Sequence, residues 1–134
     1  MTLASAGTLR SMGGQVDYTL KRRAILRDYR AGFTSRLDIC DAHPELMRAA
    51  RYIGREIAEE CPVCEQAKLR VVAYVFGDAL RRHHANGRCI TGFDELERLG
   101  EKVDEFTCYE VEVCTACSWN HLARSYLLGR QHAG

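Results

Sequence analysis

Apolar residues recur at three- and four-residue steps near the start of the chain, which is the spacing of one face of an amphipathic helix. The first such run covers residues 15–32 and ends at Gly32, a suitable C-terminal cap. Its expected inward face consists of Val16, Leu20, Ala24, Ile25, Tyr29 and Phe33. We therefore predict a first helix that packs through these residues.

The next apolar pattern is shorter, and a proline divides it. Thr34 or Ser35 is a suitable N-cap for a short helix through Asp41, and Pro44 opens another helix that Gly54 terminates. The expected inward face of this pair consists of Leu37, Cys40, Leu46, Ala49, Ala50 and Ile53. The three helices together predict a small helical unit that is compatible with helix-turn-helix geometry.

The pattern changes to that of strands in the second half of the chain. Residues 69–76, "LRVVAYVF", are β-branched and aromatic, and residues 104–113, "DEFTCYEVEV", alternate with a period of two. A third strand is predicted to begin at Trp119, with a helix as the competing interpretation. Residues 77–104 carry two short helical patterns, so they predict a helical insertion between the first two strands.

Two Cys-x-x-Cys pairs, Cys61/Cys64 and Cys114/Cys117, each adjoin a predicted strand. Such a turn directs two thiolates at one ion, so two turns complete a tetrahedral site if the strands pair antiparallel. The entropic cost of closing the loop rises only with the logarithm of its length, so about fifty intervening residues do not argue against the site. The pairs predict one structural Zn²⁺ ion in a zinc ribbon.

Other uses of these thiols are less favoured. A rubredoxin-like iron site would be expected to carry glycines where Glu65 and Ser118 stand. A thioredoxin-like dithiol leaves one pair unexplained, and an all-thiolate site has no open position for catalytic water. Of the remaining cysteines, Cys40 is predicted as a small buried residue of the helical core, and Cys89 lies in a glycine-flanked loop with no assigned role.

Composition narrows the class of protein further. The chain has 134 residues, 46% of them hydrophobic, and a formal net charge of +1, so the whole molecule has no strong field for nucleic acid or an anionic membrane. No stretch approaches the roughly 20 apolar residues of a membrane helix, and the first residues lack the pattern of a signal peptide. The chain has seven cysteines, which is an odd number. We expect a reducing cytoplasmic location, in which paired thiols serve as metal ligands more often than they form disulfides.

Charge is nevertheless distributed unevenly. Residues 1–37 contain seven basic and two acidic residues, whereas residues 94–112 contain eight acidic and two basic ones. Arg23, Arg27 and Arg30 lie three or four residues apart, so they form one row that could follow a phosphate backbone. The competing interpretation is a solvated helix face. Arg22 belongs to the same basic segment.

Catalytic motifs are lacking in this sequence. It contains no glycine-rich phosphate loop, no His-Glu-x-x-His and no Gly-x-Ser-x-Gly. Trp119 and His121 follow the second cysteine pair, where they either pack over the ribbon or contact a partner. A non-enzymatic protein is therefore expected.

Four stretches of the chain resemble a family of small uncharacterised actinobacterial proteins with a domain of unknown function. They read "VDYTLKRRAIL", "DICDAHPELMRAARYIG", "CPVCEQAKLRVVAYVFGD" and "YEVEVCTACSWNHLARSYLLG", and the resemblance covers about residues 15–129. It implies a cytoplasmic bacterial protein and metal binding by the four paired cysteines, without an assigned activity. More loosely, the ribbon half is similar to zinc ribbons of transcription and translation proteins, a likeness of fold alone.

These observations predict an α+β protein: a flexible tail (1–14), a helical unit (15–58) and an antiparallel zinc ribbon (59–134) with an insertion at 77–104. The expected function is that of a factor docking on RNA polymerase or the ribosome. Its first helix would meet RNA, DNA or an acidic protein surface, with contacts from Arg22, Arg23, Arg27, Arg30, Trp119 and His121. The alternative is a small helix-turn-helix transcriptional regulator with a structural zinc, which would read DNA through residues 44–53.

Overall fold

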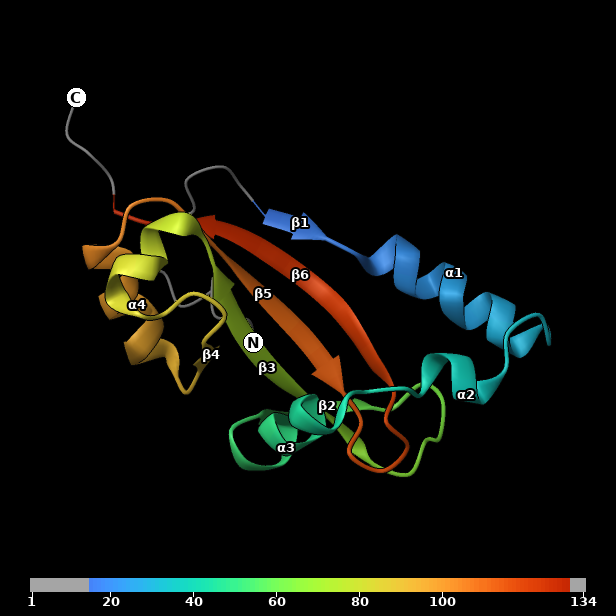
Figure 1. Cartoon of the computed structure of the whole chain (residues 1–134). Helices are drawn as coiled ribbons and strands as arrows, with labels where there is room; N and C mark the ends of the chain where they lie inside the picture. The colour runs from blue at the N-terminus through green and yellow to red at the C-terminus, as the bar shows by residue number, and fades with distance from the viewer. Residues whose placement is uncertain (1–14, 131–134) are drawn as a thin grey trace. The chain divides into compact units, whose positions relative to one another are not determined.

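The computed structural model describes residues 15–130, so the tail expected over residues 1–14 lies outside the described part of the chain. Helices and an antiparallel sheet confirm the expected α+β class (Figure 1). The elements in chain order are β1 (Gln15–Asp17), α1 (Thr19–Arg30), α2 (Arg36–Ile39), α3 (Pro44–Tyr52), β2 (Arg55–Glu60), β3 (Lys68–Phe76), the 3₁₀ helix η2 (Asp78–His83), β4 (Cys89–Ile90), α4 (Phe93–Lys102), β5 (Phe106–Val113) and β6 (Asn120–Leu128).

The strands form a six-stranded sheet in the order β1-β6-β5-β3-β2, and β4 pairs with β3. The chain divides into two compact units whose boundaries fall within β1, β3, β5 and β6. One unit contains residues 73–109 and the stretch from Arg124 onward, and the other contains residues 17–72 and 110–123. The predicted division into 15–58 and 59–134 as separately folding parts stays a prediction.

The first unit contains the insertion, and its core is apolar throughout. Leu80 of η2 and Leu96 of α4 are almost completely buried, and they pack with Val75, Phe106 and Tyr126 of the strands. The 3₁₀ helix η2 and the helix α4 lie between β3 and β5 in the chain, where the sequence pattern predicts a helical insertion. This core contains none of the paired cysteines.

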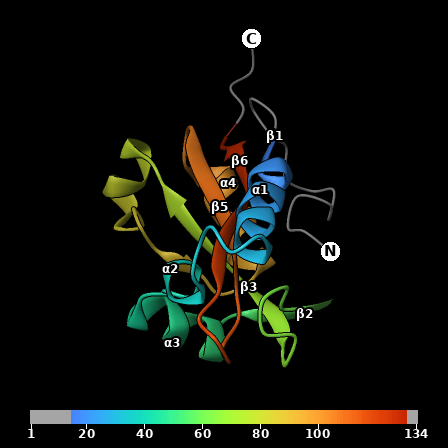
Figure 2. The ribbon, with the colours of Figure 1, turned by 90° about the vertical axis from the view of Figure 1, so that its right-hand side faces the viewer.

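The second unit contains α1, α2, α3 and β2, and its helix ends follow the predicted capping signals. Gly32 has a φ of 83°, and the N–H of Phe33 donates to the Asp28 carbonyl at 2.9 Å, which is the Schellman arrangement at the end of α1. Ser35 caps α2 in a reciprocal capping box with Asp38. Both views place α3 next to β2 (Figures 1 and 2).

The expected inward faces of the helices are wrong in part. Leu20 is 77% exposed and Phe33 is 84% exposed, whereas Leu26 is the buried residue of α1. Leu37 is 83% exposed, and the buried residues of α3 are Met47 and Ala50. The spacing of apolar residues correctly indicated helices. It did not determine which helix face packs inward, because several apolar residues fit more than one face. In α1, the face that contains Leu26 packs against the cysteine turns.

Two strands lie at the ends of the segment that was predicted as helical. Residues 15–17 form β1, so the first helix begins at Thr19, and β2 follows α3 directly. A strand beginning near Trp119 is confirmed as β6. Among the described helices, none combines the length and the apolar character that crossing a bilayer would require.

Candidate metal centre

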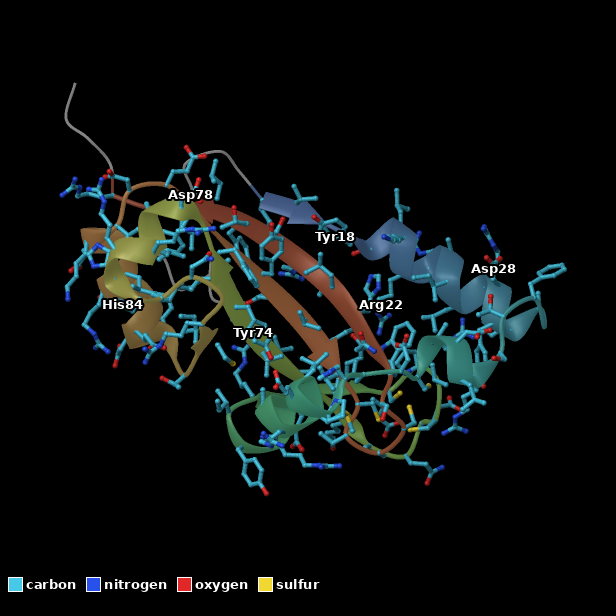
Figure 3. All side chains as sticks on the ribbon, viewed as in Figure 1. Tyr18, Arg22, Asp28, Tyr74, Asp78 and His84 are labelled. Carbon is cyan, nitrogen blue, oxygen red and sulfur yellow. The ribbon has the colours of Figure 1, made fainter. Side chains whose placement is uncertain are left out.

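Four cysteine sulfurs gather at one place although they come from distant segments. Cys61 and Cys64 lie in the turn after β2, and Cys114 and Cys117 lie in the turn after β5. Their Sγ atoms all lie within 4.8 Å of one another, and they are the one such group found in residues 15–130. Figure 3 shows sulfur atoms gathered beside α2. The convergence predicted for the two pairs is confirmed.

The distances between the sulfurs suit a tetrahedral ion. Cys61 Sγ lies 3.7 Å from Cys117 Sγ, and Cys64 Sγ lies 3.6 Å from Cys114 Sγ. Four sulfurs at about 2.3 Å from one zinc ion would be separated by about 3.8 Å along each edge of the tetrahedron. The thiols are thus spaced as ligands around an ion of this size.

Backbone N–H groups point at the sulfurs in both turns. The N–H of Val63 donates to Cys61 Sγ and the N–H of Gln66 donates to Cys64 Sγ, each at 3.4 Å. In the second turn, the N–H of Ala116 donates to the sulfur of Cys114, and the N–H of Trp119 donates to the sulfur of Cys117. Such donors stabilise negative charge on sulfur, so each turn is built for thiolates.

Without a cation, the four thiols cannot all ionise easily. Burial raises the pKa of Cys61 to about 11, and burial together with the sulfurs of Cys40 and Cys61 raises the pKa of Cys117 to about 12. Burial also acts to raise the pKa of Cys64, but the Gln66 N–H and the adjacent sulfurs outweigh it, and that pKa lies below its ordinary value. A divalent cation at the centre would supply the charge that this set lacks.

The residue after each pair adopts a left-handed backbone. Glu65 has a φ of 54° and Ser118 has a φ of 74°, in the region that glycine favours. The N–H groups of these residues donate to the carbonyls of Cys61 and Cys114 at 3.1 and 3.0 Å. The turns therefore have the conformation that a glycine would allow without strain, and the lack of glycine does not distinguish zinc from iron.

A fifth sulfur lies against this cluster. Cys40, at the end of α2, places its Sγ 3.5 Å from Cys117 Sγ, and its half-buried side chain packs against the cysteine turns. The prediction of Cys40 as an ordinary core residue of the helices is thus incomplete. No local signal reveals the contact, because Cys117 lies 77 residues away in the chain.

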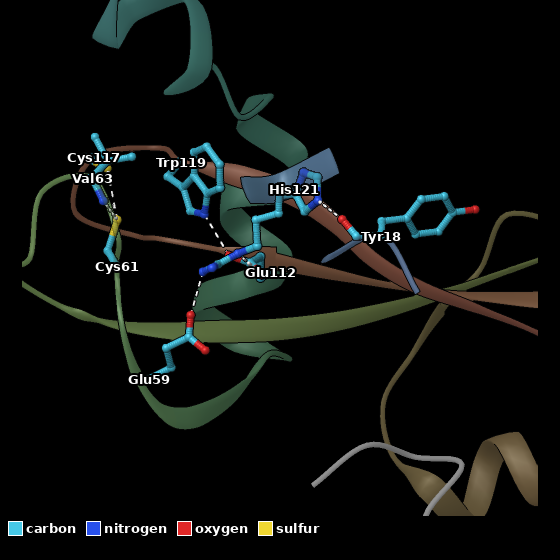
Figure 4. Close-up of polar contacts among 9 residues, drawn as sticks. Tyr18, Glu59, Cys61, Val63, Glu112, Cys117, Trp119 and His121 are labelled. Carbon is cyan, nitrogen blue, oxygen red and sulfur yellow. Dashed lines mark hydrogen bonds and ion pairs between the residues drawn. The ribbon is translucent and has the colours of Figure 1, made fainter. Parts of the chain in front are cut away.

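Glu112 is the centre of a polar network next to the cluster (Figure 4). Its carboxylate accepts from the Nε of Arg22 at 3.0 Å and from the indole Nε1 of Trp119 at 2.8 Å. Arg22 also reaches Glu59 with its Nη2 at 2.5 Å. Arg22 is thus paired with two carboxylates, and its side chain is 22% exposed. Glu112 was not predicted as a site residue. It lies on the same face of its strand as Phe106, and a glutamate on that face was the signal that could have identified it.

Trp119 and His121 lie inside the unit and not on its surface. Trp119 is 1% exposed and His121 is 7% exposed, and their rings stack with centroids 6.0 Å apart. His121 Nε2 lies 3.4 Å from the carbonyl oxygen of Tyr18, and burial lowers the pKa of its imidazole. This burial agrees with the packing interpretation of both side chains.

The other three arginines of α1 remain at the surface. Arg23, Arg27 and Arg30 are exposed, and together with Leu20, Ala24 and Ala31 they line an open hollow of about 580 Å³ along one face of α1. The opposite face carries Ile25 and Leu26, which pack against the cysteine cluster. The structure therefore separates the predicted basic row from Arg22.

The fold and the cluster together define a small α+β protein with a four-thiol site suited to a metal ion. Residues 9–134 match a family described as "Family of unknown function (DUF5318)", and the chain belongs to this family.

Mycobacterial relatives are similar along most of the chain. The uncharacterised proteins Mb0050 of Mycobacterium bovis and Rv0049 of Mycobacterium tuberculosis are each 41% identical over 114 residues, which cover 85% of this chain and 81% of the relative. No solved structure matches the chain significantly.

Proposed function

We propose that this protein is a non-enzymatic cytoplasmic factor that docks on a large nucleic-acid machine, RNA polymerase or the ribosome. A zinc ion held by Cys61, Cys64, Cys114 and Cys117 would be structural. The exposed arginines of α1 would contact nucleic acid or an acidic protein surface. One observation carries the proposal: α1 packs on the thiol cluster with one face and presents a row of arginines with the other.

The composition of that outer face supports contact with phosphate groups. Arg23, Arg27 and Arg30 each carry a guanidinium fork that matches phosphate or carboxylate geometry. The hollow beside them has Leu20 and the small side chains of alanines in its lining, so the arginines flank an apolar strip. Leu20 is 77% exposed, so this strip is open to solvent.

Zinc is the metal that the site supports best. Four thiolates around a closed site are typical of structural zinc, and no ligand position is left for catalytic water. The donor set also fits iron, so elemental analysis and the absorption spectrum of purified protein decide between a colourless zinc protein and a coloured iron protein.

The test replaces Arg23 and Arg27 together with alanine. The matched control is Arg48→Ala/Arg51→Ala, which removes the same charge from two exposed residues of α3 in the same unit. Binding to labelled single-stranded RNA and duplex DNA is measured over a range of salt concentrations. The same variants serve as bait in pull-downs scored for RNA polymerase subunits and ribosomal components.

For the α1 variant, we expect about tenfold weaker binding or more, and the negative slope of log K against log salt should become shallower by about 1.4 to 1.8. An unchanged slope removes nucleic acid from the proposal, and failure to recover either machine removes the docking role. If the α3 variant is the one that loses binding, and binding depends on DNA sequence, the helix-turn-helix regulator replaces the proposal. In this structure α2 has only four residues, which makes a short first helix for that motif.

A further inference from the structure

Cys40 and Cys117 are in sulfur–sulfur contact at the edge of this site. Their Sγ atoms are 3.5 Å apart, against 3.6 and 3.7 Å for the contacts that join the two Cys-x-x-Cys turns. A closed tetrahedral site has four ligands, and the four mutually close thiols already supply them. Cys40 is therefore a thiol that touches a ligand without belonging to the ligand set.

Cys40 is held in this position by its own loop. The N–H of Ala42 donates to the carbonyl of Ser118 at 3.0 Å, which fixes the segment after α2 against the second cysteine turn. The side chain of Arg36, one turn earlier, is fully exposed and hydrogen-bonds the Cys40 side chain. Both Cys40 and Cys117 are half-buried and not enclosed, so a small oxidant can reach the pair from solvent.

We propose that Cys40 and Cys117 are a peroxide-sensitive pair whose disulfide opens the metal site. Cys40 Sγ attacks the O–O bond of hydrogen peroxide, which gives a sulfenic acid and releases water. Cys117 Sγ then attacks the Cys40 sulfur, so that the S–S bond forms, the Cys40 S–O bond breaks and hydroxide leaves. Cys117 would thereby be lost as a ligand for a metal ion held at the site. Two sulfurs lose two electrons to one peroxide, and the metal keeps its oxidation state.

The consequence for the site follows from its ligand count. Forming the bond brings the two sulfurs from 3.5 Å to about 2.05 Å. Three thiolates then remain for the ion, and a three-thiolate site binds it more weakly. Oxidation would thus release the metal, and a thiol reductant with added metal would restore the site.

The experiment uses the full metal-loaded chain and hydrogen peroxide. Metal release is followed with a chromogenic chelator, and disulfides are mapped by mass spectrometry of peptides without reduction. Cys40→Ser and Cys40→Ala test the pair, and Cys89→Ser is the matched control because Cys89 is also half-buried but lies in the other unit. All three variants are expected to purify with the same metal content as the wild-type chain.

We expect a Cys40–Cys117 disulfide in the wild-type chain and about tenfold slower release of metal from both Cys40 variants, since the reactive thiol is absent. The Cys89 variant should release metal at the wild-type rate. Equal release from the Cys40 variants, a disulfide joining other cysteines, or loss of metal from the unoxidised Cys40 variants would each overturn the proposal. None of these measurements involves nucleic acid or a docking partner, so failure here leaves the proposed function untouched.

Discussion

At the scale of single residues, the buried carboxylate of Glu112 shows how the second unit accommodates charge. Glu112 is 7% exposed, and a carboxylate removed from water is costly unless it is paired and hydrogen-bonded. Here it accepts from both Arg22 Nε and Trp119 Nε1, and the Arg22 Nη2 lies 2.9 Å from Glu112 Oε2. One side chain thereby joins α1 to β5 and to the tryptophan beside the second cysteine turn.

Replacing Glu112 with glutamine should destabilise the protein by about 1 to 3 kcal/mol, because Arg22 loses its less exposed partner while remaining largely enclosed. Denaturant unfolding of the metal-loaded protein measures this change. Glu59→Gln is the matched control, since Glu59 contacts the same guanidinium with a side chain that is 55% exposed, and we expect a change within about 0.5 kcal/mol. Equal effects of the two substitutions would contradict the assigned role of burial.

Residue-level prediction succeeded where spacing along the chain carries the chemistry. The four cysteines that cluster were identified because a Cys-x-x-Cys turn is local and its ligand geometry is nearly independent of the rest of the fold. Contacts made across the chain were missed: the approach of Cys40 to Cys117, and the enclosure of Arg22 by Glu112 and Glu59. These depend on which helix face packs inward, which apolar periodicity alone did not determine.

At the scale of elements, strands rich in β-branched and aromatic residues were predictable, whereas the charged strand β2 was not. Its sequence "REIAEE" has one partly buried apolar side chain, Ile57, and five exposed residues. It lies at one end of the sheet order, where charged residues protect an edge from pairing with another chain. Its strand conformation follows from pairing with β3 and not from its own pattern.

The end of α3 depends on a residue of β3. Arg70 donates from Nε to the Ala50 carbonyl and from Nη2 to the Gly54 carbonyl, each at 2.6 Å, so it satisfies acceptors that a helix end leaves unpaired. Arg70→Met keeps most of the side-chain volume but removes both donors, and we expect a loss of about 1 to 3 kcal/mol in unfolding free energy.

Hydrogen exchange locates that loss, with faster exchange expected in α3. Arg55→Met, at an exposed position of β2, is the matched control and should leave both the stability and the exchange of α3 nearly unchanged. Slower or unaltered exchange in α3 of the Arg70 variant would show that its end is held by other contacts.

At the scale of the whole molecule, the α+β class of the fold was predictable from the sequence. Helical periodicity followed by strand signals is enough for an α+β assignment. The predicted boundary near residue 58 stays a prediction, and α1, α2 and α3 belong to the same compact unit as both cysteine turns. Leu26 of α1 packs with Cys61, Cys114 and Trp119, so helices and cysteine turns share one small core.

From that shared core we predict that a metal ion at the cysteine cluster is required for folding of the second unit. Structural zinc contributes on the order of 10 kcal/mol or more of apparent binding free energy, which is comparable to the whole stability of a small domain. Without the metal ion, nothing would bind the four thiols to one another. The core that they form with Leu26, Leu69 and Trp119 would then lose this cross-link. We therefore expect a chelator to unfold the core that holds α1.

Trp119 reports this event directly, because it is the single tryptophan of the chain and is 1% exposed. On treatment with a strong chelator, its fluorescence emission should shift to the wavelength of a solvated indole, and readdition of Zn²⁺ should reverse the shift. Cys114→Ser should show the solvated emission from the start, whereas Cys89→Ser, at a cysteine outside the cluster, should behave as the wild type. The contrary result is an emission spectrum that stays unchanged after metal analysis shows that the ion is gone. Apolar packing alone would then maintain this core, and the cluster would be a binding site without a structural role.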